Sequence, residues 1–175
     1  MHDRRWRTLD QLSLLERELK TTNPAELADV SDRVLIREVI GRYFYAVDRG
    51  DWAALASCFA VDAHYEAADG FIDAHSRDAI LEVLTGGSPY AERSHVMSSV
   101  EVVTDRDTAS GDTFAIAYLL DGGIDKGRFM VRGLQYLDSF VRTADGWRIK
   151  TRRHITRWQF DALAVPPMRP KTLVR

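Results

Sequence analysis

The chain has 175 residues, and its 24 Lys and Arg side chains stand against 26 Asp and Glu side chains, for a formal charge of −2. This length corresponds to about one domain. Nothing in the near-balance of charge suggests a nucleic-acid partner, whose binding would require a concentrated basic face. The sequence contains no apolar run long enough to cross a membrane. Cys58, the single cysteine, has no partner for an internal disulfide, which favours a reduced, cytoplasmic setting.

The first part of the chain is predicted to be helical. Leucines at helical spacing predict a short helix over residues 8–20 within an N-terminal extension, residues 1–28. The strongest helix is predicted over residues 32–49, because its apolar side chains form one stripe with a period of 3.6 residues. Gly50 is well placed to end this helix.

Two shorter helices and a strand are predicted next. Asp51 can cap a helix over residues 52–58, and Ser76 can cap a helix over residues 77–84. Alternating apolar residues at 63–66 predict a strand between them.

The second part of the chain reads as strands separated by short turns. Asp-rich and Gly-rich turns of the hairpin kind separate four segments, so successive strands are expected to be antiparallel neighbours: residues 94–103, 109–120, 129–141 and 147–160. Helices followed by strands predict an α+β domain, residues 29–160, in which helices pack on one curved antiparallel sheet. Prolines make the tail, residues 161–175, irregular.

The last predicted strand changes its alternation. Trp147 lies at an odd position and Trp158 at an even one, so a bulge or a strong twist is expected between them. One of the adjacent arginines, Arg152 or Arg153, is then expected to face inward, and the alternation does not choose between them.

Asp48 and His95 are the first candidates for chemistry. Asp48 lies at the end of the strongest helix, where a negative charge opposes the helix dipole, so a role that needs a carboxylate competes with a plain solvated acid. His95 begins a strand, and a half-buried structural histidine is the alternative there. Histidine moves protons near neutral pH, and a carboxylate within reach would orient it and raise its basicity.

Tyr43 and Tyr65 are candidates for phenols that point into a pocket, with buried core tyrosines as the alternative. The sequence has no phosphate loop and no dinucleotide fingerprint. The histidines show no paired metal-ligand spacing, so no metal site is predicted. The expectation is acid–base chemistry on a small molecule without a cofactor.

Several segments resemble a known family. They are residues 43–52 (YFYAVDRGDW), 59–63 (FAVDA), 93–96 (RSHV) and the terminal hairpin, 136–152. Their order and spacing resemble the SnoaL-like branch of the nuclear-transport-factor-2-like superfamily over about residues 30–160. Within it, the chain looks most similar to the group of hexachlorocyclohexane dehydrochlorinase, scytalone dehydratase and bile-acid dehydratase.

The resemblance implies a cone-shaped α+β barrel with a central apolar pocket. It implies a catalytic pair of His95 and Asp48, a hydrogen-bonding Tyr43 and an Arg152 that steadies the leaving group. Four side chains are expected in the pocket: Phe44, Val47, Trp52 and Tyr65. It also implies a homo-oligomer, a trimer with a dimer as the alternative.

Three functions are weighed on this basis. The first is a lyase or isomerase that acts on a small apolar ring compound by proton abstraction. The second is a non-catalytic small subunit of a ring-hydroxylating dioxygenase, which has the same fold. The third is a binding protein for an apolar ligand, in which Asp48 and His95 form a structural pair.

Overall fold

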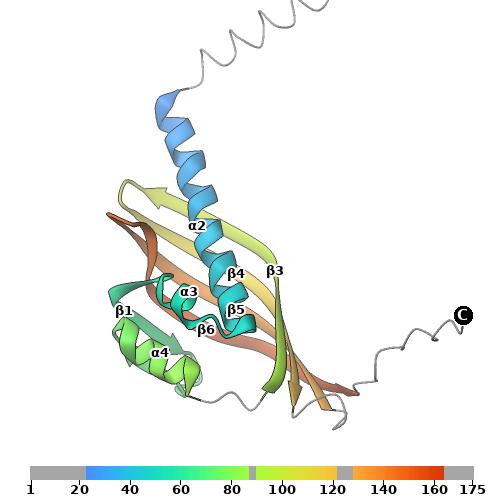
Figure 1. Cartoon of the computed structure of the whole chain (residues 1–175). Helices are drawn as coiled ribbons and strands as arrows, with labels where there is room; N and C mark the ends of the chain where they lie inside the picture. The colour runs from blue at the N-terminus through green and yellow to red at the C-terminus, as the bar shows by residue number, and fades with distance from the viewer. Residues whose placement is uncertain (1–22, 87–89, 122–127, 164–175) are drawn as a thin grey trace, which may run out of the picture.

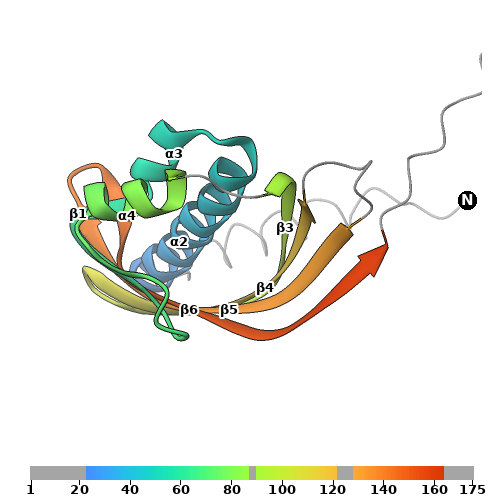
Figure 2. The same cartoon turned by 90° about the horizontal axis from the view of Figure 1, so that it is seen from below.

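The computed structural model describes residues 23–86, 90–121 and 128–163. Three helices lie on one face of a six-stranded sheet (Figure 1), and the sheet curves around them (Figure 2). The predicted α+β architecture with a curved sheet is therefore confirmed. The helix predicted over residues 8–20 and the tail beyond residue 163 lie outside the described residues. No helix among the described segments is long and apolar enough to span a membrane.

The sheet has the strand order β2-β1-β6-β5-β4-β3. Its strands are β1 (Phe59–Ala67), β2 (Asp73–His75), β3 (Tyr90–Asp105), β4 (Thr108–Asp121), β5 (Arg128–Thr143) and β6 (Gly146–Leu163). The four strands from β3 to β6 form the predicted antiparallel meander.

Two features at the other edge correct the sequence prediction. The strand β1 pairs with β6 in parallel, whereas only antiparallel pairing was expected. The edge strand β2, which pairs with β1, was not predicted at all. The strand β2 has three residues, which are too few to show a recognisable alternation of apolar and polar residues in the sequence.

The helix α2 (Pro24–Arg49) crosses the concave face of the sheet (Figure 1). It begins eight residues before the predicted start, since the Asn23 side chain caps it and Pro24 occupies its first turn. Its early turns are exposed and carry no apolar stripe, so the apolar periodicity did not predict them. The buried stripe starts at Ile36, and Gly50 ends the helix with a left-handed φ of 68°.

The other helices are short and cover the β1 end of the sheet. They are α3 (Trp52–Ala56) and α4 (Arg77–Thr85). Both predicted caps are confirmed: the Asp51 carboxylate accepts a hydrogen bond from the amide of Ala54 at 3.0 Å, and the Ser76 hydroxyl accepts one from the amide of Ala79 at 3.2 Å.

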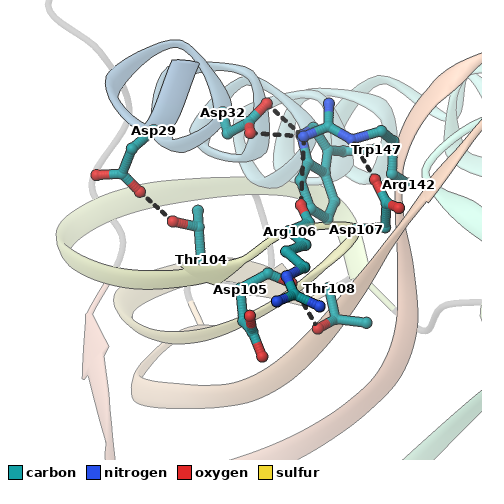
Figure 3. Close-up of polar contacts among 9 residues, drawn as sticks. All are labelled: Asp29, Asp32, Thr104, Asp105, Arg106, Asp107, Thr108, Arg142 and Trp147. Atoms are coloured by element: carbon teal, nitrogen blue, oxygen red, sulfur yellow. Dashed lines mark hydrogen bonds and ion pairs between the residues drawn. The ribbon is translucent and has the colours of Figure 1, made fainter. Parts of the chain in front are cut away.

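A polar network fixes the early turns of α2 to the sheet (Figure 3). The Asp32 carboxylate accepts hydrogen bonds from Arg142 Nη2 at 2.5 Å and from Trp147 Nε1 at 3.1 Å. Arg142 also donates to Asp107 at 3.0 Å. The Arg142 guanidinium holds the pKa of the Asp32 carboxyl below its usual range. This network lies near the opposite end of the helix from Asp48.

The last strand, β6, contains the expected irregularity. Its pairing with β5 skips Lys150 and again Arg157, so the strand bulges at both positions. The first bulge turns Arg152 inward, where it is 1% exposed. Arg153 faces outward and pairs with Glu66 at 3.2 Å.

Candidate active site

The end of α2 meets the edge strand β3 through Asp48 and His95. Asp48 Oδ1 lies 2.6 Å from His95 Nδ1, and Asp48 Oδ2 accepts a hydrogen bond from the His95 backbone amide at 2.7 Å. The two side chains are 19% and 9% exposed. One carboxylate therefore holds both the backbone and the ring of the same residue.

This contact fixes which ring nitrogen is basic. An ionised carboxylate can only accept hydrogen bonds, so His95 Nδ1 carries the proton that it shares with Asp48. The other nitrogen, Nε2, then has a free lone pair in the neutral ring. The arrangement matches the orienting acid and general base of a catalytic triad, without the nucleophile.

Phe44 backs the histidine from the preceding turn of α2. Its ring stacks on the His95 imidazole, with centroids 5.4 Å apart and planes 19° apart. Phe44 does not line the cavity described next, although it was expected there. Its contact restricts the imidazole to one plane.

A cavity of about 290 Å³ opens between α2, α4 and the sheet. Its wall is aliphatic in part, with Val47, Ile72, Val83, Leu84, Ala117, Leu119 and Leu134. Its polar side chains are Tyr43, Tyr65, Tyr90, Arg93, His95, Arg132, Tyr136 and His154. Among the described residues that line it, two are arginines and none is acidic. The cavity is thus apolar with a rim and floor of hydrogen-bond donors.

Three buried tyrosines form much of this floor. Tyr43, Tyr65 and Tyr136 are each 3% exposed, and the rings of Tyr43 and Tyr136 meet edge to face at 6.0 Å. Burial raises the pKa of all three phenols above the usual value. They stay protonated at neutral pH and can donate hydrogen bonds.

Arg152 lies directly behind the tyrosines. Its guanidinium carbon is 4.0 Å from the ring centroid of Tyr43 and 4.6 Å from that of Tyr136. Two hydrogen bonds, of 2.8 and 2.7 Å, join it to the buried carboxylate of Asp138. Burial opposes this charge, but Asp138 outweighs the burial and keeps the pKa of Arg152 above its usual value. Arg152 does not itself line the cavity.

His154 is a cavity residue that sequence reasoning missed. It lies two residues after Arg152 on β6, so it shares the inward face, and that spacing was the available signal. Its ring stacks on Tyr136 at 5.2 Å, and its Nε2 is buried without a hydrogen-bond partner among the described residues. Burial, with help from Arg152, lowers the pKa of His154 to about 4, so the ring is neutral at pH 7.

Of the remaining predicted pocket residues, two line the cavity and one does not. Val47 and Tyr65 line the cavity. Trp52 does not, because it caps the outer surface with 37% of its area exposed and with the Arg93 guanidinium 5.7 Å from its ring centroid. Sequence placed it in the pocket, but its ring lies beside Gly50 and Arg93, outside the cavity lining.

A second hollow, of about 590 Å³, lies at the other end of the sheet. Its titratable lining side chains are Asp62 and Lys150, which form an ion pair at 2.5 Å. These two groups neutralise each other, so the hollow lacks a poised acid or base. The cavity at His95 is the better candidate site.

Comparison with known proteins identifies the family of the chain. The model of the SnoaL-like domain family matches residues 28–153. The chain belongs to the SnoaL-like family. This SnoaL-like protein is also 32% identical over 127 residues to uncharacterized proteins of Mycobacterium tuberculosis and Mycobacterium bovis, a match that covers 70% of this chain and 84% of each relative.

Solved structures share the fold. An NTF2-like protein of Novosphingobium aromaticivorans is 26% identical, with a TM-score of 0.68 over 78% of this chain and 92% of that one. A scytalone dehydratase-like protein of the same organism is 22% identical, with a TM-score of 0.69 over 81% and 97%. A hexachlorocyclohexane dehydrochlorinase is 15% identical, with a TM-score of 0.73 over 83% and 98%. At these identities the last two matches describe the fold alone.

Proposed function

We propose that this SnoaL-like protein is a lyase or isomerase that abstracts a proton from carbon with the His95–Asp48 pair and needs no cofactor. The observation that carries the proposal is the two-point contact by which Asp48 holds His95 on the wall of a cavity. A structural pair needs no cavity beside it, whereas a general base needs a substrate within reach of its lone pair.

The chemistry begins at His95 Nε2. It takes a proton from a carbon beside a carbonyl, and the electrons of the broken C–H bond move onto the carbonyl oxygen. For elimination, the resulting enolate collapses and expels a β-hydroxyl group. The imidazolium returns its proton to that group, so water leaves and His95 is neutral again. For isomerisation, the imidazolium returns the proton to another carbon.

The three tyrosines suit the enolate oxygen. Phenols that burial keeps protonated donate hydrogen bonds to developing negative charge, and a water-poor cavity strengthens this stabilisation. We assign the first such bond to Tyr43, which lies one and a half turns before Asp48 on α2. Arg152, behind Tyr43, acts through the phenol rather than by touching the substrate.

The cavity also limits the substrate. A volume of about 290 Å³ is at the lower end for ligand pockets, which suits a compound with one or two rings. The aliphatic wall favours an apolar ring, and the donors favour a ring that carries an oxygen. Two neighbours that share the fold are a dehydratase-like protein and a dehydrochlorinase, so elimination is the first reaction class to test.

A panel of cyclic β-hydroxy ketones tests the proposal, because loss of water creates an enone with a strong ultraviolet absorbance. We expect turnover by the native protein and a fall of about 10²–10⁴-fold in kcat for His95→Gln. Glu101→Gln, an exposed change on the same strand as His95, is the matched control and should keep full activity. If the protein bound members of the panel saturably but turned over none of them, it would instead be a binding protein.

The proposal does not depend on assembly. The homo-oligomer, with a trimer favoured over a dimer, stays a prediction that analytical ultracentrifugation tests. Sedimentation as a monomer at micromolar concentration would contradict it.

A further inference from the structure

The outer face of the β1–β2 hairpin gathers three side chains that the proposed reaction does not use. His64 on β1 lies directly opposite His75 on β2, and Asp73 lies two residues before His75. Residues two apart on a strand share a face. His64, Asp73 and His75 therefore stand together on the face of the hairpin that points away from the cavity.

Their polar atoms converge on one point. His64 Nε2 lies 2.7 Å from Asp73 Oδ1, and His75 Nε2 lies 3.1 Å from the same oxygen. The two imidazole rings stack, with centroids 4.1 Å apart and planes 9° apart. The three potential ligand atoms all lie within 4.8 Å of one another.

We propose that these three residues bind a divalent transition-metal ion of the Zn²⁺ type. Imidazole nitrogen and carboxylate oxygen are normal zinc ligands, at about 2.0–2.2 Å. A tetrahedral ion with such bonds holds its ligand atoms about 3.3 Å apart. The present separations of 2.7 and 3.1 Å are close to that value. Because the two rings now stack in parallel, one imidazole has to rotate so that both Nε2 lone pairs point at the ion. Three protein ligands leave a fourth position for water or another donor.

Sequence reasoning predicted no metal site, because the histidines lack the local spacing of known motifs. Cross-strand pairing supplies the convergence instead, since His64 and His75 are eleven residues apart in the chain and face to face in the sheet. The unpredicted strand β2 is what creates the cluster.

An ion at this position would brace the cavity wall from behind. The opposite face of the same hairpin carries Tyr65 and Ile72, which both line the cavity. The strand β2 has three residues and lies at the edge of the sheet, so few backbone hydrogen bonds hold it. A metal bridge between β1 and β2 would fix this edge.

Isothermal titration of the untagged, chelator-treated full chain with Zn²⁺ tests the site. We expect one ion per chain with a dissociation constant in the micromolar range or tighter, and a melting temperature that rises with Zn²⁺ concentration. His75→Gln and Asp73→Asn should each weaken binding about tenfold or more. Both side chains are mostly exposed, so these variants should fold.

The matched control is Asp78→Asn, which removes a 90% exposed carboxylate near the hairpin and should leave Zn²⁺ binding unchanged. Native affinity for Zn²⁺ in both His75→Gln and Asp73→Asn would overturn the proposal. The absence of any heat of binding at a Zn²⁺ concentration of about 100 µM would also overturn it. His2, in the N-terminal extension, is a histidine outside the proposed site. Loss of binding in His2→Gln with native affinity in His75→Gln would also overturn the proposal.

Discussion

Asp48 holds His95 by two atoms, because one carboxylate oxygen contacts the ring at 2.6 Å and the other accepts from the backbone amide at 2.7 Å. The end of α2 and the strand β3 are thereby locked in register at the residue that carries the basic nitrogen. The strand β3 is itself held by its pairing with β4, so the second contact fixes the end of α2 against that strand. The bidentate contact positions the ring and its backbone together.

Asp48→Asn tests the role of the charge. The amide of Asn can donate to His95 Nδ1, which would move the ring proton to Nε2 and remove the free lone pair. We expect kcat to fall by about 10²-fold or more, with little change in the melting temperature. Steady-state kinetics and thermal denaturation measure the two effects, and an active Asp48→Asn would contradict the assigned role.

The buried pair of Arg152 and Asp138 should dominate local stability. Either Arg152→Met or Asp138→Leu leaves a buried charge without its partner, at a cost of about 3–5 kcal/mol in the free energy of unfolding. The double variant removes both charges and should recover most of that loss. Urea denaturation of the four proteins measures this coupling; additive losses in the double variant would show that the pair is not coupled.

Asp32 should stabilise the attachment of α2. Asp32→Ala leaves the buried Trp147 indole without its acceptor, which costs about 1–3 kcal/mol. Asp32→Asn can keep this acceptor and loses only the charge. Because the folded-state pKa of Asp32 is lowered, its charge stabilises the fold above the unfolded value of 3.8 and that stability is lost as the pH falls through the folded value. The free energy of unfolding of Asp32→Asn should therefore fall less steeply at acid pH than that of the native protein. Identical pH dependence of the two proteins at acid pH would contradict this role of Asp32.

His154 should make stability depend on pH in a higher range. Its folded pKa is about 4 against 6.5 in the unfolded chain, so between these values the unfolded state binds the extra proton. Stability is therefore lost as the pH falls from about 6.5 to about 4. His154→Gln should lose less stability over this window. The free energies of unfolding of both proteins, measured across it, should diverge; parallel curves would show that His154 is not buried in the neutral form.

Local sequence patterns were sufficient for much of the fold and for the central pair. The stripe of α2 and the turn sequences of the meander follow from short-range periodicity, and the position of Asp48 follows from the helix end at Gly50. The change of alternation on β6 predicted a bulge or twist and one inward arginine, and the structure shows that this arginine is Arg152. The match of Asp48 and His95 came from family resemblance rather than from spacing.

The features that sequence missed depend on pairing between distant segments. Asp138 meets Arg152 only through the β5–β6 register, and His64 meets His75 only because β2 forms. The start of α2 was missed because its first turns are exposed and have no apolar stripe. Trp52 was misplaced because the direction in which α3 leaves α2 is set by tertiary packing.

Exchange of carbon-bound hydrogen for deuterium tests proton abstraction most directly. The native protein, His95→Gln and Glu101→Gln would each be incubated in D₂O with a cyclic ketone that lacks a leaving group, and proton NMR would follow the signal beside the carbonyl. Proton abstraction by His95 predicts loss of that signal with the native protein and with Glu101→Gln, and exchange at the slow uncatalysed rate with His95→Gln. Equal exchange rates with and without the His95 imidazole would contradict it.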